Sequence, residues 1–68
     1  MEKLGERLRE LRNEKELSAM ALAKIIHVSD ATIIRWENSK IGMSIDNLVR
    51  LAKFFEVTTD YLLGLTDF

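Results

Sequence analysis

An all-α fold is predicted by three properties of this 68-residue sequence. It contains no proline and only three glycines, so few residues interrupt regular structure. Leucine, alanine, glutamate, lysine and arginine, which favour helices, make up much of the chain. Apolar residues also recur at three- and four-residue intervals, which is the spacing of one helix face. We therefore expect a compact bundle of five short helices.

Hydroxyl side chains mark where the later helices begin, because a hydroxyl can accept a hydrogen bond from the first free N–H groups. The expected helices cover about residues 3–15, 19–26, 30–38 and 45–56, followed by a short helix that contains Tyr61, Leu62 and Leu63. The expected caps are Ser18, Ser29, Ser44 and Thr58, and Gly64 is expected to end the last helix.

Each helix has apolar residues that can face a common core. In the first, third and fourth helices they are Leu4, Leu8 and Leu11; Ile33 and Trp36; and Ile45, Leu48, Leu51, Ala52 and Phe55. The second helix, AMALAKII, is apolar along most of its length, so we expect it to be largely buried. Only His27 and Val28 separate it from the cap of the next helix, which predicts a tight helix-turn-helix.

The composition argues against catalysis and against bound metal ions. The chain has no cysteine and a single histidine, His27, so it lacks a thiolate site and a zinc site with two imidazoles. No serine has the histidine and aspartate partners of a nucleophile. We expect no enzymatic activity, no metal and no cofactor. The apolar runs fall short of the roughly 20 residues of a membrane span, so we expect a cytoplasmic protein without membrane contacts.

The third helix is the expected contact with double-stranded DNA, because a helix in this position can enter the major groove. With Ile33 and Trp36 buried, its outer face carries Asp30, Ala31, Ile34, Arg35 and Asn38. A guanidinium suits guanine, and small apolar groups suit the thymine methyl group. N–H groups at the helix N-terminus can donate to phosphates.

Six runs of the sequence are typical of one protein family: GERLRELRNEK at 5–15, LS at 17–18, ALAKII at 21–26, VS at 28–29, ATIIRWENSK at 31–40 and NLVRLAKFFEVTTDYLLG at 47–64. On these runs the chain resembles the phage-repressor-like (Cro-type, or XRE-type) helix-turn-helix family of bacterial and phage transcription regulators. The resemblance covers nearly the whole chain. It implies a lambda-repressor-like DNA-binding domain over residues 1–68, with the helix-turn-helix at about 18–38.

The resemblance also implies roles for individual residues. Trp36 is expected to pack between the third and fourth helices, and Arg12 to form a structural ion pair with Glu37. The residues expected to read bases or the adjacent backbone are Asp30, Ala31, Thr32, Ile34 and Arg35. Asn38 and Lys40 match phosphate-contacting positions, to which we add Ser18, Ser29 and Ser39 as phosphate-positioning candidates.

Some of these residues have a second interpretation. Asp30 suits the positive end of the helix dipole better than it suits phosphates, although its carboxylate can also accept a hydrogen bond from cytosine. Ile34 either contacts a thymine methyl group or is an ordinary exposed apolar residue. Arg35 is either solvated or, as we favour, in contact with DNA.

Two positions and one loop depart from the family pattern, and they imply weaker anchoring on DNA phosphates. Ala19 stands where glutamine usually supports a phosphate contact, and His27 stands where glycine usually adopts a positive φ angle. The loop after the third helix lacks the usual basic residues and proline, with Met43 in that region and Lys40 as its one base.

The end of the chain carries more apolar side chains than one short helix can bury. We expect Tyr61 and Leu62 to join the core, and Leu63, Leu65 and Phe68 to form an exposed patch that joins two copies in a homodimer. A two-fold dimer places two recognition helices about 34 Å apart, one turn of DNA.

Two functions are open at this point. The favoured one is a transcriptional regulator, expected to be a repressor that binds a palindromic operator as a dimer. The alternative is a protein-interaction module on the same fold, of antirepressor or antitoxin type, which the net charge of −1 favours. However, residues 17–43 carry three basic and two acidic side chains, whereas residues 44–68 carry two and four. The motif is thus slightly basic, and we expect weak binding by a monomer.

Overall fold

Five helices, α1 to α5, account for all the regular structure in the computed structural model, which describes residues 2–38 and 42–68. The helices are α1 (Glu2–Glu14), α2 (Ala19–Ile26), α3 (Asp30–Glu37), α4 (Ile45–Phe55) and α5 (Thr59–Leu63). They form a body of 28 × 23 × 19 Å. The prediction of an all-α bundle is confirmed, and the helix limits agree with the expected ones to within about one residue at each end.

The four predicted caps all form. Each cap residue has an extended backbone, and its hydroxyl oxygen accepts a hydrogen bond from the backbone N–H three residues later. The donors to Ser18, Ser29, Ser44 and Thr58 lie at 3.0, 3.1, 3.2 and 3.0 Å, respectively. These local contacts explain why the starts of α2 to α5 could be found in the sequence.

Several helices end on a residue in the left-handed backbone region. His27 follows α2 with φ 68°, as predicted, and Gly64 follows α5 with φ 83°. A Cβ atom at Gly64 would lie 2.5 Å from the Cβ atom of Lys3, so α1 leaves room for glycine alone. Glu16 and Glu56 also adopt positive φ angles, of 56° and 57°, although glutamate has no preference for this region.

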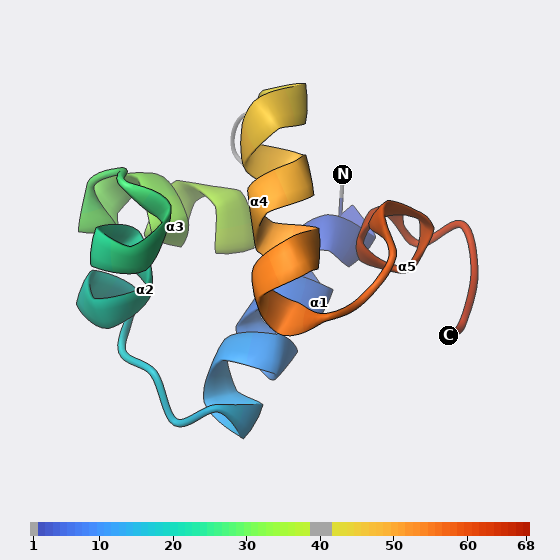
Figure 1. The fold of residues 1–68 in the computed structure, drawn as a ribbon, viewed down its shortest axis with the longest axis horizontal. Coiled ribbons are helices and arrows are strands. Elements are labelled where there is room, and N and C mark those ends of the chain that lie inside the picture. The colour runs from blue at the N-terminus through green and yellow to red at the C-terminus, as the bar shows by residue number, and fades with distance from the viewer. Residues whose placement is uncertain (1, 39–41) are drawn as a thin grey trace.

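The core is formed by apolar residues of all five helices: Leu4, Leu8, Leu11, Leu22, Ala23, Ile26, Ile33, Trp36, Leu51, Ala52, Phe55 and Leu62. Val28, Leu48 and Tyr61 are partly buried against it. Within this arrangement α1 packs on α3 and α5, and α2 packs on α3 and α4. The helix-turn-helix lies at one end of the long axis, and α5 with the C-terminus lies at the other (Figure 1).

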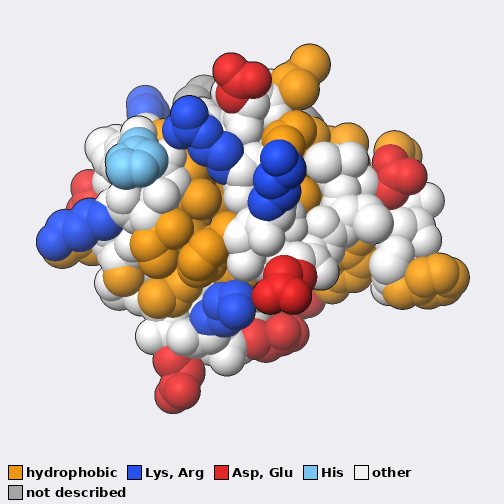
Figure 2. Space-filling model, in the orientation of Figure 1, with side chains coloured by type: hydrophobic (Ala, Val, Ile, Leu, Met, Phe, Trp, Pro, Cys, Tyr) orange, Lys and Arg blue, Asp and Glu red, His pale blue; other side chains and the backbone are white. Residues whose placement is uncertain are grey.

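Two expectations about burial were wrong. The helix α2 is not largely buried, because its 3.6-residue period turns Met20 and Ile25 outward while Leu22 and Ile26 face the core. Figure 2 shows hydrophobic side chains at the surface in the region between α2 and α4. Ile45 is also exposed, because it occupies the first position of α4, beyond the reach of the core.

Among the described residues, no helix is both long enough and apolar enough to cross a bilayer.

Candidate nucleic-acid interface

One face of α3 is turned to solvent, and it carries most of the residues expected to contact DNA. Ile33 and Trp36 are buried on the opposite face, which fixes the rotation of the helix about its axis. The exposed residues are Asp30, Ala31, Ile34, Arg35 and Asn38, and Thr32 is half-buried. The structure therefore places these six residues on one short helix and its cap, with polar and apolar groups side by side.

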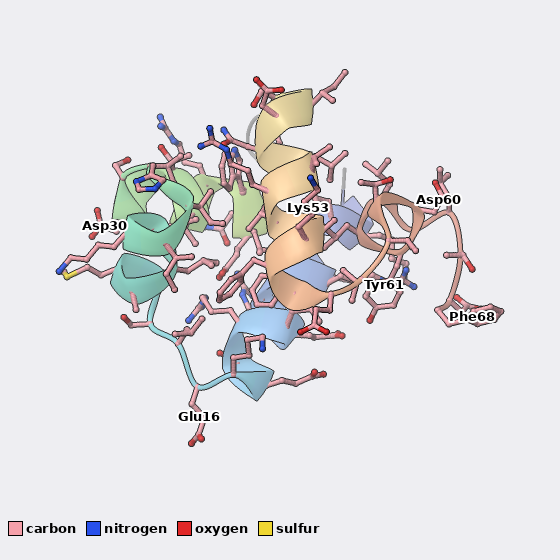
Figure 3. All side chains as sticks on the ribbon, viewed as in Figure 1. Glu16, Asp30, Lys53, Asp60, Tyr61 and Phe68 are labelled. Carbon is pink, nitrogen blue, oxygen red and sulfur yellow. The ribbon has the colours of Figure 1, made fainter. Side chains whose placement is uncertain are left out.

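The first turn of α3 is held by hydrogen bonds among its own residues. The hydroxyl groups of Ser29 and Thr32 lie 2.9 Å apart, and Ser29 Oγ also accepts from the Thr32 N–H. The Asp30 carboxylate accepts from the Ala31 N–H at 2.9 Å, beside the positive end of the helix dipole. Figure 3 shows Asp30 at the outer end of the molecule. This geometry agrees with the interpretation of Asp30 as a first-turn dipole partner.

Arg35 extends back along the exposed face of α3. Its Nη2 atom lies 3.4 Å from Thr32 Oγ1, at the long limit of a hydrogen bond. A hydrogen bond of this length restrains the guanidinium only weakly, so Arg35 can exchange it for another acceptor. The five N–H donors of a guanidinium suit the paired acceptors of a guanine edge, and Arg35 presents this group outside the core.

The last turn of α3 is joined to α1 by an ion pair. Arg12 donates to Glu37 through Nε at 2.6 Å and through Nη2 at 3.0 Å, and Arg12 Nη1 donates to the Leu17 carbonyl at 2.8 Å. The Glu37 side chain is only 4% exposed. The hydrogen bond from Arg12 to Glu37 raises the pKa of Arg12, and this effect outweighs the lowering caused by burial.

A second arginine reaches the same carboxylate, and the sequence interpretation did not assign it a role. Arg9 Nε lies 3.4 Å from Glu37 Oε1, and Arg9 Nη2 donates to Asn38 Oδ1 at 3.0 Å. Arg9 and Arg12 are three residues apart, so they share a side of α1. That spacing shows that Arg9 and Arg12 lie on one side of α1, but by itself it does not identify Glu37 as a shared partner.

The expected phosphate-positioning residues fall in three places. Ser18 and Ser29 are exposed at the starts of α2 and α3, and Asn38 is exposed at the end of α3. Ser39 and Lys40 lie outside the described residues. Of the departures from the family pattern, Ala19 is half-buried at the start of α2 and Met43 is half-buried against the core.

The apolar C-terminal patch is exposed at the far end of the molecule from Asp30 (Figure 3). Leu63 and Leu65 are exposed, and Phe68 is 92% exposed. Arg7 of α1 holds this segment, because its Nη1 atom donates to the carbonyl groups of Tyr61 and Thr66.

The same Arg7 guanidinium lies over the Tyr61 ring, 4.2 Å from its centroid, and 3.6 Å from the Asp67 carboxylate. Arg7 thus links α1 to α5 and to the last residues. This contact could not be predicted from the sequence, because Arg7 and Thr66 are 59 positions apart.

Within residues 2–38 and 42–68, no three histidine, aspartate or glutamate side chains lie close enough together to hold a metal ion. The exposed face of α3 instead carries the Arg35 guanidinium, the Asn38 amide and the apolar groups of Ala31 and Ile34, and groups of these kinds can contact a DNA duplex.

The chain is similar in sequence to a known protein family and to individual transcription regulators. Residues 8–62 match the profile of a helix-turn-helix family. The chain is 37% identical over 60 residues to repressor protein C2 of Salmonella phage P22, covering 88% of this chain and 28% of that protein. It is 38% identical over 60 residues to the transcriptional activator BcrR of Enterococcus faecalis, covering 88% and 29%, respectively.

A third relative is the HTH-type transcriptional regulator YobD of Bacillus subtilis, with 37% identity over 62 residues, 91% of this chain and 55% of that protein. The chain therefore spans under a third of the first two relatives and about half of YobD.

The chain is also similar to solved structures of regulatory proteins. The P22 c2 repressor in complex with a synthetic operator superimposes with a TM-score of 0.82 at 36% identity, over 87% of this chain and 89% of that one. The restriction-modification controller protein C.AhdI of Aeromonas hydrophila superimposes with a TM-score of 0.80 at 31% identity, over 90% and 92%.

Proposed function

Because this chain belongs to the phage-repressor-like (Cro-type, or XRE-type) helix-turn-helix family, we propose that it is a sequence-specific DNA-binding transcriptional regulator. In this proposal α3 enters the major groove and the remaining helices hold it there. The observation that carries the proposal is the division of α3 into a buried face, with Ile33 and Trp36, and an exposed face that ends in Arg35. The likeness to a repressor solved on its operator supports the same docking.

Sequence reading is assigned to the exposed residues of α3. Arg35 supplies a guanidinium for guanine, and Ala31 and Ile34 supply apolar contacts for thymine methyl groups. Thr32, whose hydroxyl lies 3.4 Å from the Arg35 guanidinium, is the remaining base-reading candidate. Asp30 discriminates between bases, because its carboxylate can accept a hydrogen bond from cytosine. It adds no overall affinity, because phosphates repel it.

We assign the contacts that position the protein on the DNA phosphate backbone to groups on either side of α3. These are Ser18, Ser29, Asn38, Ser39 and Lys40, with the N–H groups at the starts of α2 and α3. Such contacts carry no sequence information, but they set the register of α3 in the groove.

We also propose that the protein acts as a homodimer on a palindromic operator and represses by occupying it. Leu63, Leu65 and Phe68 form the proposed dimer surface. Since this patch and Asp30 lie at opposite ends of the molecule (Figure 3), joining two copies through it leaves the start of α3 uncovered. The whole of residues 1–68 then acts as one DNA-binding domain in the cytoplasm, without catalysis.

Binding to random-sequence duplex over a range of salt concentrations tests the proposal against the interaction-module alternative. The logarithm of the association constant is expected to fall linearly with the logarithm of the salt concentration. Arg35→Ala is expected to lose about 1–3 kcal/mol of specific binding if it makes a bidentate base contact. Absence of any salt-dependent binding contradicts the proposal and favours a protein partner.

A further inference from the structure

Two guanidinium groups meet one carboxylate at the C-terminal end of α3. Arg12 approaches Glu37 through two short contacts, at 2.6 and 3.0 Å, whereas Arg9 approaches it through one contact at 3.4 Å. Both arginines come from α1, and the carboxylate comes from α3. The cluster of Arg9, Arg12 and Glu37 therefore carries one more positive than negative charge.

The surplus charge is located on Arg9. The Arg12 and Glu37 side chains are 17% and 4% exposed, so their two charges neutralise each other within the protein. The Arg9 side chain is 50% exposed, and its single long contact with Glu37 satisfies little of its charge. This cluster thus presents one cation to solvent, at a fixed position relative to α3.

Arg9 also orients a residue of the proposed DNA surface. Its Nη2 atom donates to Asn38 Oδ1 at 3.0 Å. Because a guanidinium can only donate, this contact fixes the amide oxygen of Asn38 toward Arg9 and directs the amide N–H groups elsewhere. Asn38 caps α3, where the helix dipole is negative and disfavours a phosphate. A cation at this point reverses that local repulsion.

We infer that Arg9 is a phosphate-positioning residue, which holds a backbone phosphate of the duplex beside the C-terminal end of α3 together with the Asn38 amide. This inference rests on the proposed function. It also identifies a basic group for a surface whose loop is poor in basic residues. The ion pair between Arg12 and Glu37 serves as the rigid support, because it fixes α1 against α3 at the same place.

The test compares the salt dependence of two charge-neutralising variants on a duplex that the wild-type protein has selected from a random pool. In Arg9→Gln, the slope of log association constant against log salt concentration is expected to become less negative by about 0.9 per protomer, with the preferred sequence unchanged. Lys53→Gln is the matched control, because Lys53 is an exposed cation in the last turn of α4, outside the proposed interface. Its slope is expected to equal that of the wild type.

Arg9→Lys keeps the charge and is expected to keep the slope, which separates a charge effect from altered packing. Thermal unfolding of each variant shows whether the fold is retained. An Arg9→Gln slope equal to the wild-type slope overturns the inference and leaves the proposed function intact. Failure of the wild-type protein to select any duplex overturns both.

Discussion

Arg12 and Glu37 join α1 to the last turn of α3 through two hydrogen bonds, with Nε 2.6 Å from Oε2 and Nη2 3.0 Å from Oε1. The contact is bidentate, the arrangement that a guanidinium and a carboxylate favour. Since α3 carries the proposed base-reading residues, this pair sets the position of the reading surface relative to the rest of the bundle.

Removing one member of this pair is expected to destabilise the protein strongly. Arg12→Met leaves the Glu37 carboxylate buried with only the distant contact to Arg9, and we expect the free energy of unfolding to fall by about 3–5 kcal/mol. Urea denaturation followed by circular dichroism measures this change. The double variant Arg12→Met with Glu37→Leu is expected to recover part of the loss, because no charge remains buried. A loss below about 1 kcal/mol in the single variant contradicts a structural role for the pair.

Replacing Arg7 is expected to release the C-terminal segment. Arg7→Met removes the donor to the Tyr61 and Thr66 carbonyl groups and the guanidinium above the Tyr61 ring. Each lost hydrogen bond is worth about 0.5–1.5 kcal/mol. The Leu65 N–H, which donates to the Asp60 carbonyl, is therefore expected to exchange its hydrogen faster.

Asp67→Asn is the control for this experiment. The Asp67 side chain is 98% exposed, so its ion pair with Arg7 is expected to contribute almost nothing to stability. If exchange at Leu65 accelerates equally in both variants, the segment is held by the ion pair and the role given to the carbonyl contacts is wrong.

Glycine at position 27 is expected to stabilise the protein. His27 has φ 68°, in the left-handed region, where a residue with a side chain is destabilised by roughly 1 kcal/mol. His27→Gly is thus expected to raise the midpoint of thermal unfolding. Lys24→Gly, inside α2, is the control with the opposite expected sign. It is expected to lower the free energy of unfolding by about 1 kcal/mol. A lower midpoint for His27→Gly indicates that the imidazole makes a stabilising contact.

Disrupting the apolar C-terminal patch is expected to separate the proposed dimer without unfolding the protein. Phe68 is 92% exposed, so Phe68→Glu removes little from the core of a single copy. Sedimentation equilibrium is expected to show a lower mass for the variant at concentrations where the wild type is dimeric. Equal masses for both proteins exclude Phe68 from the subunit contact.

The fold was predictable because its determinants are local. Each cap depends on a hydroxyl and an N–H three residues away, and each buried stripe depends on the helical repeat within one segment. The stripe of α2 could not be located, because nearly every residue of AMALAKII is apolar and the pattern has no polar side. Ile45 was misplaced for a related reason, since periodicity does not show where the core ends along a helix.

The candidate site was predictable where it lies on α3 and less so where α1 contributes. The exposed face of α3 follows from the positions of Ile33 and Trp36. The contacts of Arg9 join residues 28 and 29 positions apart, and those of Arg7 join residues 54 and 59 positions apart. Charged side chains at such separations find partners only after folding, and their spacing along the chain does not specify which.

Selection of bound sequences from a random duplex pool tests the central claim most directly, because it requires both DNA binding and sequence reading. The proposal predicts enrichment of one inverted repeat, with half-site centres about one helical turn (roughly 34 Å) apart, and a changed consensus for Arg35→Ala. A pool that remains random after repeated rounds contradicts the assignment of this surface to sequence-specific DNA binding.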